Sequence, residues 1–182
     1  MIITETGIEG LVILEPRVFE DSRGYFFESY NRGTWNQMGI ISDFVQDNQS
    51  KSSYGVIRGL HYQLAPHSQT KVVRVLSGEV LDVAVDLRRK SKTFGKSFSV
   101  LLSDKNKRQM HIPQGFAHGF AVLSPEAIFY YKCDQLYNPE AERGIIYDDP
   151  ELKIDWMIPE NDRIISDKDT KLLTFRKSEM NF

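Results

Sequence analysis

The chain has 182 residues, of which 41% are hydrophobic and 26% are charged, and its formal net charge is −2. This size suits one well-filled globular domain, here residues 1–182. A net charge so close to zero gives no global field to attract nucleic acid or an acidic membrane, so we expect neither as a partner. A bound anion would need a local cluster of basic side chains.

Cysteine usage and the N-terminus bear on the compartment. Cys133 is the single cysteine, so no internal disulfide can form, which fits a reducing compartment. Met1–Thr6 lacks the basic and apolar regions of a secretion signal, and no apolar run approaches the ~20 residues of a membrane span. The sequence therefore predicts a cytoplasmic protein.

The N-terminal part of the chain alternates extended segments with turns. Aromatic residues make up 12% of the chain, which favours a β-rich fold. Ile8–Glu15 is predicted to be a strand, and Asn31–Gly39 to hold a short helix that stops at Gly39. Arg23 and Glu28 bracket an aromatic extended run, and on spacing alone an exposed ion pair or a solvated turn explains them better than ligand binding.

The middle of the chain carries a series of predicted strands. In Phe44–Ser50, Gln46 and Asn48 share one strand face, where they would either bind a ligand or make hydrogen bonds within a loop. Apolar residues alternate through Glu79–Leu87, so Asp82 and Asp86 are expected to face solvent or pair with neighbouring basic residues. Strands are also predicted at the following segments: Lys71–Leu76 and Phe98–Leu102.

The second half places further polar residues on strand faces. After the turn formed by Pro113 and Gly115, His118 shares a face with Phe120. Alternation within the strand Ala127–Asp134 predicts that Tyr131 points inward. A short last helix is predicted at Lys171–Phe175, capped by residues 166–170. Many short strands with few short helices indicate a mainly β fold, a barrel or sandwich of jelly-roll type.

The stretch Arg58–Gln63 places a guanidinium, an imidazole, a phenol and an amide within six residues. Gly59 would permit a backbone irregularity that lets Arg58 and His61 face one cavity despite their odd spacing. Because imidazole titrates near neutral pH, His61 is a natural general base. Tyr131 is a candidate acid and Lys71 a candidate electrostatic stabiliser. Spacing alone does not bring these side chains together, so a His61 that is packed or paired at the surface remains an alternative.

The four histidines invite a test for a metal site. Pro113-x-Gly115-x-x-His118 resembles the second half-motif of the cupin superfamily. The first half-motif needs His-x-His followed by Glu, whereas this chain has His61-Tyr62-Gln63 and then His67-Ser68. An amide is a poor ligand for a divalent ion, so the sequence favours a cupin barrel whose metal site is lost. His67 and His111 are interpreted as structural or surface residues.

Several motifs occur in the order of one known family. Together they closely resemble the dTDP-4-dehydrorhamnose 3,5-epimerase family from about residue 5 to 173. The motifs are Asp21-x-Arg23-Gly24-x-Phe26-x-Glu28, Val45-Gln46-Asp47-Asn48, Arg58-Gly59-Leu60-His61-Tyr62-Gln63, Asp86-Leu87-Arg88, Pro113-x-Gly115-Phe116-Ala117-His118-Gly119-Phe120, Tyr131-Lys132, Asp148-Asp149-Pro150, Asp155-Trp156 and Ser166-x-Lys168-Asp169.

The resemblance implies a homodimeric cupin without a cofactor that acts on dTDP-4-keto-6-deoxy-D-glucose, inverting C3 and C5 on the way to dTDP-L-rhamnose for surface polysaccharide. It assigns His61 as proton acceptor, Tyr131 as proton donor, Asp169 as the carboxylate partner of His61, and Lys71 as the group facing the sugar's O4. It also implies that Arg23 reaches a ligand bound largely by the other chain. The positions that match substrate contacts are Arg23, Glu28, Gln46, Asn48, Arg58, His118, Tyr137, Glu142 and Lys168.

The chain departs from the family pattern at Tyr147, where many members have Trp, and at Met157, where Pro is usual. We expect altered packing and no change of reaction. Three alternatives stay open: inversion at C3 or C5 alone, or of a 4-keto sugar on another nucleotide; a metal-dependent cupin, disfavoured by Gln63; and a non-enzymatic sugar-binding cupin, for which His61, Lys71, Tyr131 and Asp169 would be needless.

Overall fold

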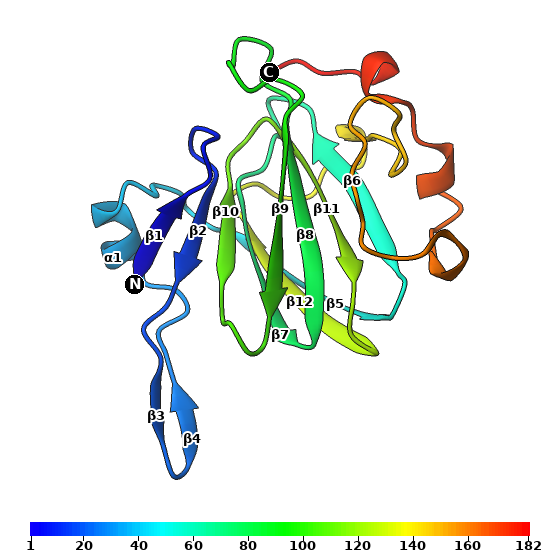
Figure 1. Ribbon diagram of the computed structural model, residues 1–182. Coiled ribbons are helices and arrows are strands. Elements are labelled where there is room, and N and C mark those ends of the chain that lie inside the picture. Colours follow the sequence, from blue (N-terminus) through cyan, green and yellow to red (C-terminus); the bar gives the residue numbers. More distant parts are fainter.

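The computed structural model describes residues 1–182 as two facing antiparallel sheets with short flanking helices (Figure 1). The six-stranded sheet has the order β1 (Ile2–Glu5), β2 (Val12–Glu15), β10 (Gln109–Ile112), β7 (Lys71–Ser77), β12 (Glu126–Cys133) and β5 (Gln46–Ser53). The five-stranded sheet has the order β13 (Glu142–Gly144), β6 (Ile57–Gln63), β11 (Phe116–Val122), β8 (Glu79–Asp86) and β9 (Ser97–Ser103).

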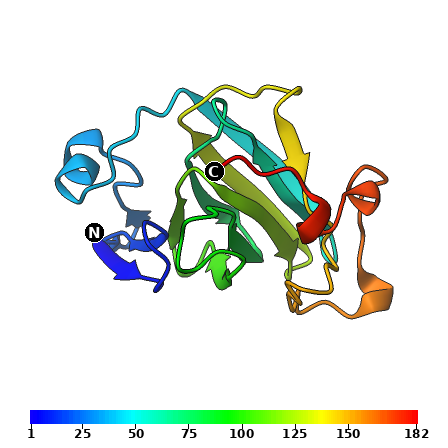
Figure 2. The same ribbon diagram turned by 90° about the horizontal axis from the view of Figure 1, so that it is seen from above.

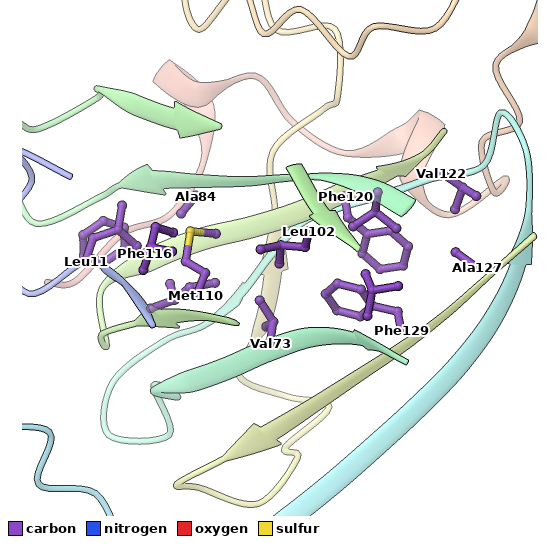
Figure 3. Close-up of a cluster of buried hydrophobic side chains, with 14 of the residues drawn as sticks. Leu11, Val73, Ala84, Leu102, Met110, Phe116, Phe120, Val122, Ala127 and Phe129 are labelled. Carbon is purple, nitrogen blue, oxygen red and sulfur yellow. The ribbon is translucent and has the colours of Figure 1, made fainter. Parts of the chain in front are cut away.

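The main core fills the space between the two sheets. Figure 3 shows Val73 and Phe129 of the six-stranded sheet facing Leu102 and Phe120 of the five-stranded sheet. The rings of Phe120 and Phe129 stack with centroids 4.1 Å apart and planes inclined by 17°. Apolar side chains from both inner faces thus close a jelly-roll interior, and the predicted mainly β fold is confirmed.

A second apolar layer covers the outer face of the five-stranded sheet. We call residues 145–182 the C-terminal strap; Figures 1 and 2 show it in orange and red alongside β6. Its Trp156 and Phe175 belong to one buried cluster with Leu81 and Val83 of β8. The strap contains three short 3₁₀ helices, η1 (Glu160–Asp162), η2 (Asp169–Lys171) and η3 (Phe175–Lys177).

The strap corrects the prediction for β8. Alternation was read as one buried and one solvated face, but both faces of β8 are buried. Val80 and Ala84, which share a face with the two aspartates, pack in the core between the sheets, and the strap covers the opposite face, which carries Leu81 and Val83. Asp82 and Asp86 are both 0% exposed. Asp86 pairs with Arg88, as one of the two expectations had it. The solvent-facing alternative is wrong for both carboxylates, and Asp82 instead meets His118 of the adjacent strand.

The helix predictions had mixed outcomes. Helix α1 (Arg32–Gln37) lies within the predicted range, with the Asn31 side chain accepting a hydrogen bond from the Thr34 amide. The predicted helix at Lys171–Phe175 is wrong. Leu172 is extended there, and Leu173 forms a parallel bridge with Ile145. Pairing with Ile145, the residue that follows β13, therefore replaces helical hydrogen bonds. No helix is long and apolar enough to cross a membrane.

The hairpin of β3 (Phe19–Asp21) and β4 (Gly24–Phe26) projects from the body of the fold (Figure 1). All six of its strand residues are exposed, including the aromatic Phe19, Tyr25 and Phe26. A two-stranded hairpin with exposed aromatic side chains buries little of its own surface, so its stability needs support from outside the hairpin.

Candidate active site

A cavity of about 620 Å³ opens between the two sheets. Its walls come from β5, β6, β7, β11 and β12, and the strap closes one side with residues 164–166, 168 and 169. Eight of the residues proposed from the sequence line it: Asn48, Arg58, His61, Lys71, His118, Tyr131, Lys168 and Asp169. The fold therefore gathers residues that are far apart in the chain into one space.

A bulge in β6 lets Arg58 and His61 share this cavity. His61 lies opposite His118 of β11, and Arg58 lies opposite Phe120, so β6 carries one extra residue between these pairs. Gly59 has φ +126°, and a Cβ there would lie 2.5 Å from the Gly119 Cα. Only glycine fits this close approach. The predicted irregularity at Gly59 is confirmed.

His61 forms an imidazole–carboxylate pair with the strap. Its Nε2 lies 2.7 Å from Oδ1 of Asp169, whose other oxygen accepts a 3.4 Å hydrogen bond from the Gly59 amide. Burial raises the pKa of the Asp169 carboxyl, but the hydrogen bond and charge of His61 outweigh it and hold that pKa below its usual value. The ionised carboxylate fixes the ring and stabilises an imidazolium, while the other ring nitrogen is left for chemistry.

Lys71 and Tyr131 come from neighbouring strands on the opposite wall. The Lys71 Nζ lies 5.7 Å from the centroid of the Tyr131 ring, and no carboxylate forms an ion pair with this ammonium. Burial lowers the pKa of Lys71 and raises that of the Tyr131 phenol. The phenol thus holds its proton at neutral pH, and the neighbouring Lys71 in its protonated form can stabilise a developing negative charge.

His118 forms a second imidazole–carboxylate pair within the cavity wall. Its Nε2 lies 3.0 and 3.1 Å from the two oxygens of Asp82. Both side chains are nearly inaccessible, at 8% and 0% exposure. The sequence did not single out Asp82 as a site residue, because alternation along β8 was read as placing its face toward solvent, whereas that face packs between the two sheets beside Val80 and Ala84.

Arg58 and Asn48 are further polar residues of the cavity lining, and each is held by a neighbouring side chain. Arg58 Nε donates a 3.1 Å hydrogen bond to Ser52 Oγ, a contact that sequence spacing did not suggest. Asn48 is held by Gln46, whose Nε2 donates to Asn48 Oδ1 at 2.9 Å.

Outside the cavity lining, Glu142 accepts hydrogen bonds from the Tyr137 hydroxyl at 2.8 Å and from Lys168 Nζ at 2.6 Å. Burial raises the pKa of Glu142, but these two donors outweigh it and hold the pKa below its usual value. Gln46 joins this network, because its Oε1 accepts a hydrogen bond from the Tyr137 amide. Gln46, Tyr137 and Glu142 therefore form a connected rim next to the cavity.

Arg23 and Glu28 lie outside this site. Arg23 pairs with Asp21 within the projecting hairpin, and its side chain is 88% exposed. Glu28 accepts a hydrogen bond from Asn31 Nδ2 at 2.9 Å. Within one chain, neither residue reaches the cavity lining.

Gln63, the last residue of His61-Tyr62-Gln63, has a structural role. Gln63 Nε2 donates to the His67 carbonyl at 2.6 Å and to the Leu136 carbonyl at 3.3 Å, while its Oε1 accepts from the Asn138 amide at 2.7 Å. Its amide thus joins backbone groups outside the cavity lining. No three His, Cys, Asp or Glu side chains are grouped in a way that could hold a metal ion. His111 bonds to the Gly10 carbonyl, which agrees with a structural role.

The fold and the cavity define a class of protein. A jelly-roll cavity with a carboxylate-supported imidazole, a protonated phenol and a buried ammonium is equipped to move protons next to a developing negative charge, as an isomerase of carbonyl compounds does. The family model described as dTDP-4-dehydrorhamnose 3,5-epimerase matches residues 5–177. The chain belongs to this family, and its fold is of the cupin type.

Individual relatives agree with the family match. A dTDP-4-dehydrorhamnose 3,5-epimerase of Shigella flexneri is 52% identical over 93% of both chains. The crystal structure of the enzyme of that name from Elizabethkingia anophelis has 52% identity, a TM-score of 0.93 and 97% coverage of both chains. A Legionella pneumophila epimerase, solved in complex with dTDP-4-keto-L-rhamnose, has 49% identity and a TM-score of 0.92, covering 96% of this chain and 93% of the other.

Proposed function

We propose that the chain epimerises dTDP-4-dehydro-6-deoxy-D-glucose at C3 and C5 to give dTDP-4-dehydro-L-rhamnose, as a step of dTDP-L-rhamnose synthesis. The observation that carries this proposal is the joint placement of His61, Asp169, Lys71 and Tyr131 on one cavity in a member of this family. The ketone at C4 acidifies the hydrogens on both neighbouring carbons, because the carbanion that remains delocalises onto O4 as an enolate.

Each of the four side chains has a task in this chemistry. His61 removes the proton from one face of the sugar, with Asp169 stabilising the imidazolium that forms. Lys71 places positive charge where the enolate oxygen develops, an effect that contributes about 3–4 kcal/mol per donor in other enzymes. Tyr131 returns a proton from the opposite face, which inverts the carbon. The opposed walls that carry His61 and Tyr131 support this division, since β6 belongs to one sheet and β12 to the other.

The nucleotide end of the substrate needs anion binding and hydrogen bonding. We propose that Arg58 binds the diphosphate, because a guanidinium can bind two phosphate oxygens at once. His118, Lys168, and the rim and wall residues Gln46, Asn48, Tyr137 and Glu142 would contact the remainder of the substrate. The reaction as proposed uses no metal and no other cofactor.

We also propose that two copies form a homodimer in which Arg23 and Glu28 of one chain approach the cavity of the other. The support is that both residues lie away from their own cavity, next to exposed aromatic side chains of the projecting hairpin. A cytoplasmic location is proposed as well, supported by the buried, unpaired Cys133, which fits a reducing compartment.

The deciding experiment is incubation with dTDP-4-keto-6-deoxy-D-glucose in D₂O, followed by NMR. We expect deuterium at C3 and C5, and no exchange with His61→Ala. With Tyr131→Phe, proton abstraction is largely retained but inversion is impaired. Exchange at only one carbon would make the protein a C3 or C5 mono-epimerase, and no exchange with a folded wild type would rule out the proposed function.

A further inference from the structure

The Asp82 carboxylate is buried inside the protein with a single partner. It is 0% exposed, and both of its oxygens face the same atom, Nε2 of His118, at 3.0 and 3.1 Å. No backbone amide, arginine or lysine donates to it. A carboxylate out of water needs a hydrogen-bond donor, and the one donor within reach is the Nε2–H of His118. This nitrogen therefore carries a proton.

The rest of the His118 ring is equally constrained. One face stacks on Phe129, with centroids 6.0 Å apart and planes inclined by 22°. Phe129 is in turn stacked on Phe120. The remaining ring nitrogen, Nδ1, has no partner within the protein, although His118 lines the cavity. The ring is thus held at its edge by a carboxylate and at its face by an aromatic side chain, with one nitrogen left for a ligand.

We propose that Asp82 is a positioning residue of the site: it fixes His118 as the Nε2–H tautomer, so that Nδ1 accepts a hydrogen bond from a hydroxyl of the bound sugar. In a neutral imidazole with its proton on Nε2, Nδ1 is the acceptor. A ring in the other tautomer would point an N–H into the cavity and leave the Asp82 carboxylate facing a lone pair. The assignment of a sugar hydroxyl as the ligand rests on the proposed function, whereas the assignment of the tautomer does not.

The strand offers a matched control for this role. Asp86 is on β8 with Asp82 and is equally inaccessible, but its oxygens accept hydrogen bonds from Arg88, Ser91 and Thr93 and it does not line the cavity. Changing either aspartate to asparagine removes one buried charge at nearly constant volume. If Asp82 has a purely structural role, the two variants should have similar effects on kcat/KM. If Asp82 positions His118, only Asp82→Asn should change the tautomer and kcat/KM.

The first test is ¹⁵N NMR of the wild-type protein labelled at histidine, with the His118 signals assigned by their absence in His118→Ala. We expect His118 as the Nε2–H tautomer, and finding the Nδ1–H tautomer would overturn the proposal. This measurement needs no substrate and no Asp82 variant. It therefore gives an answer even if Asp82→Asn does not fold or the proposed function fails.

The second test compares the variants kinetically. Asp82→Asn should lower kcat/KM on the order of 10–100-fold, by analogy with the loss found when the hydrogen-bond partner of a metal-ligating histidine is changed. The single tautomer should be lost as well. Asp86→Asn should leave the His118 tautomer and kcat/KM unchanged, although it lowers the melting temperature.

In a His118→Ala background, and at a pH below the alkaline limb where Lys71 stays protonated, Asp82→Asn should have no further effect on kcat/KM, because under these conditions Asp82 acts through His118. A folded Asp82→Asn protein with wild-type kcat/KM, or fully additive losses in the double variant, would contradict the proposal.

Discussion

The cavity contains two imidazole–carboxylate pairs that differ in almost every other respect. The His61 side chain is 30% exposed and its partner Asp169 comes from the C-terminal strap, whereas His118 and Asp82 are both buried on adjacent strands of one sheet. A base has to approach its substrate and change charge, so it needs access and a carboxylate with further donors. A ring that only orients a ligand can be locked in place. The difference shows how one pair of residue types serves two tasks.

The largest expected effect comes from the carboxylate of the accessible pair. Asp169→Asn should lower kcat on the order of 10³-fold, below the roughly 10⁴-fold loss that the same change causes in a hydrolytic triad. The loss should exceed that of Asp82→Asn, because Asp169 supports the base itself. Steady-state kinetics of Asp169→Asn and Asp82→Asn, measured side by side, checks which loss is larger. Equal losses would contradict the different tasks assigned to the two pairs.

The docking of the strap can be disturbed at Gly144, which belongs to neither pair but lies opposite His61 in the sheet. A Cβ on Gly144 would lie 2.7 Å from Leu172 Cδ1 and 2.9 Å from the Leu60 carbonyl oxygen. Gly144→Ala should therefore displace the segment that carries Asp169 and lower kcat by up to about 10²-fold, the effect of a small misplacement of a catalytic group. In ¹⁵N NMR, His61 signals should shift while those of His118 stay in place; the reverse pattern would show that the strap does not control the first pair.

The carboxylate of the buried pair, Asp82, also acts on Lys71. The negative charge of Asp82 favours the Lys71 ammonium and so opposes the lowering of its pKa by burial. Asp82→Asn removes that charge, so the pKa of Lys71 should fall further and the ammonium should lose its proton at lower pH. The alkaline limb of the pH profile of kcat should then move toward acid.

Tyr131 would not mask this shift, because burial raises its pKa and it keeps its proton to higher pH. Lys71→Arg provides the control, since a guanidinium stays charged and the limb assigned to Lys71 should vanish. An alkaline limb that persists unchanged in Lys71→Arg would mean that another group sets it.

The smallest expected effect lies outside both pairs, at the support of Arg58. Ser52→Ala removes the acceptor for Arg58 Nε, a hydrogen bond worth about 0.5–1.5 kcal/mol, so KM should rise about 2- to 10-fold with kcat nearly unchanged. Ser53→Ala is the neighbouring control, because Ser53 is exposed and alternates to the other strand face. A fall in kcat without a change in KM would show that Ser52 does not act through substrate binding.

Local patterns were sufficient for much of the fold. Alternation within Ala127–Asp134 put Tyr131 on the inner face, and the odd spacing of Arg58 and His61 around a glycine predicted the bulge. The turn residues and the missing long helices indicated a jelly roll. These features depend on interactions between residues that are close in sequence, so the sequence carries them directly.

Long-range burial could not be predicted in the same way. Asp82 was expected in solvent or with neighbouring basic residues because nothing within Glu79–Leu87 shows that its face packs against the other sheet while the distant strap covers the opposite face. One short segment of the strap, Lys171–Phe175, was wrongly predicted to be a helix, because the bridge between Leu173 and Ile145 outweighs local propensity. The contact of His61 with Asp169 spans 108 residues, and only resemblance to a family pointed to it.

This sequence separation links the timing of folding to activity. The base is on a strand in the first half of the chain, and its carboxylate is on the strap. One parallel bridge between Ile164 and Val56, an apolar layer and side-chain contacts such as that of Lys168 with Glu142 hold the strap on the body. Sheets closed without a docked strap would contain an imidazole with no partner. The ability to exchange the substrate's protons would therefore appear only once the strap has docked, so turnover would report strap docking in a refolding experiment.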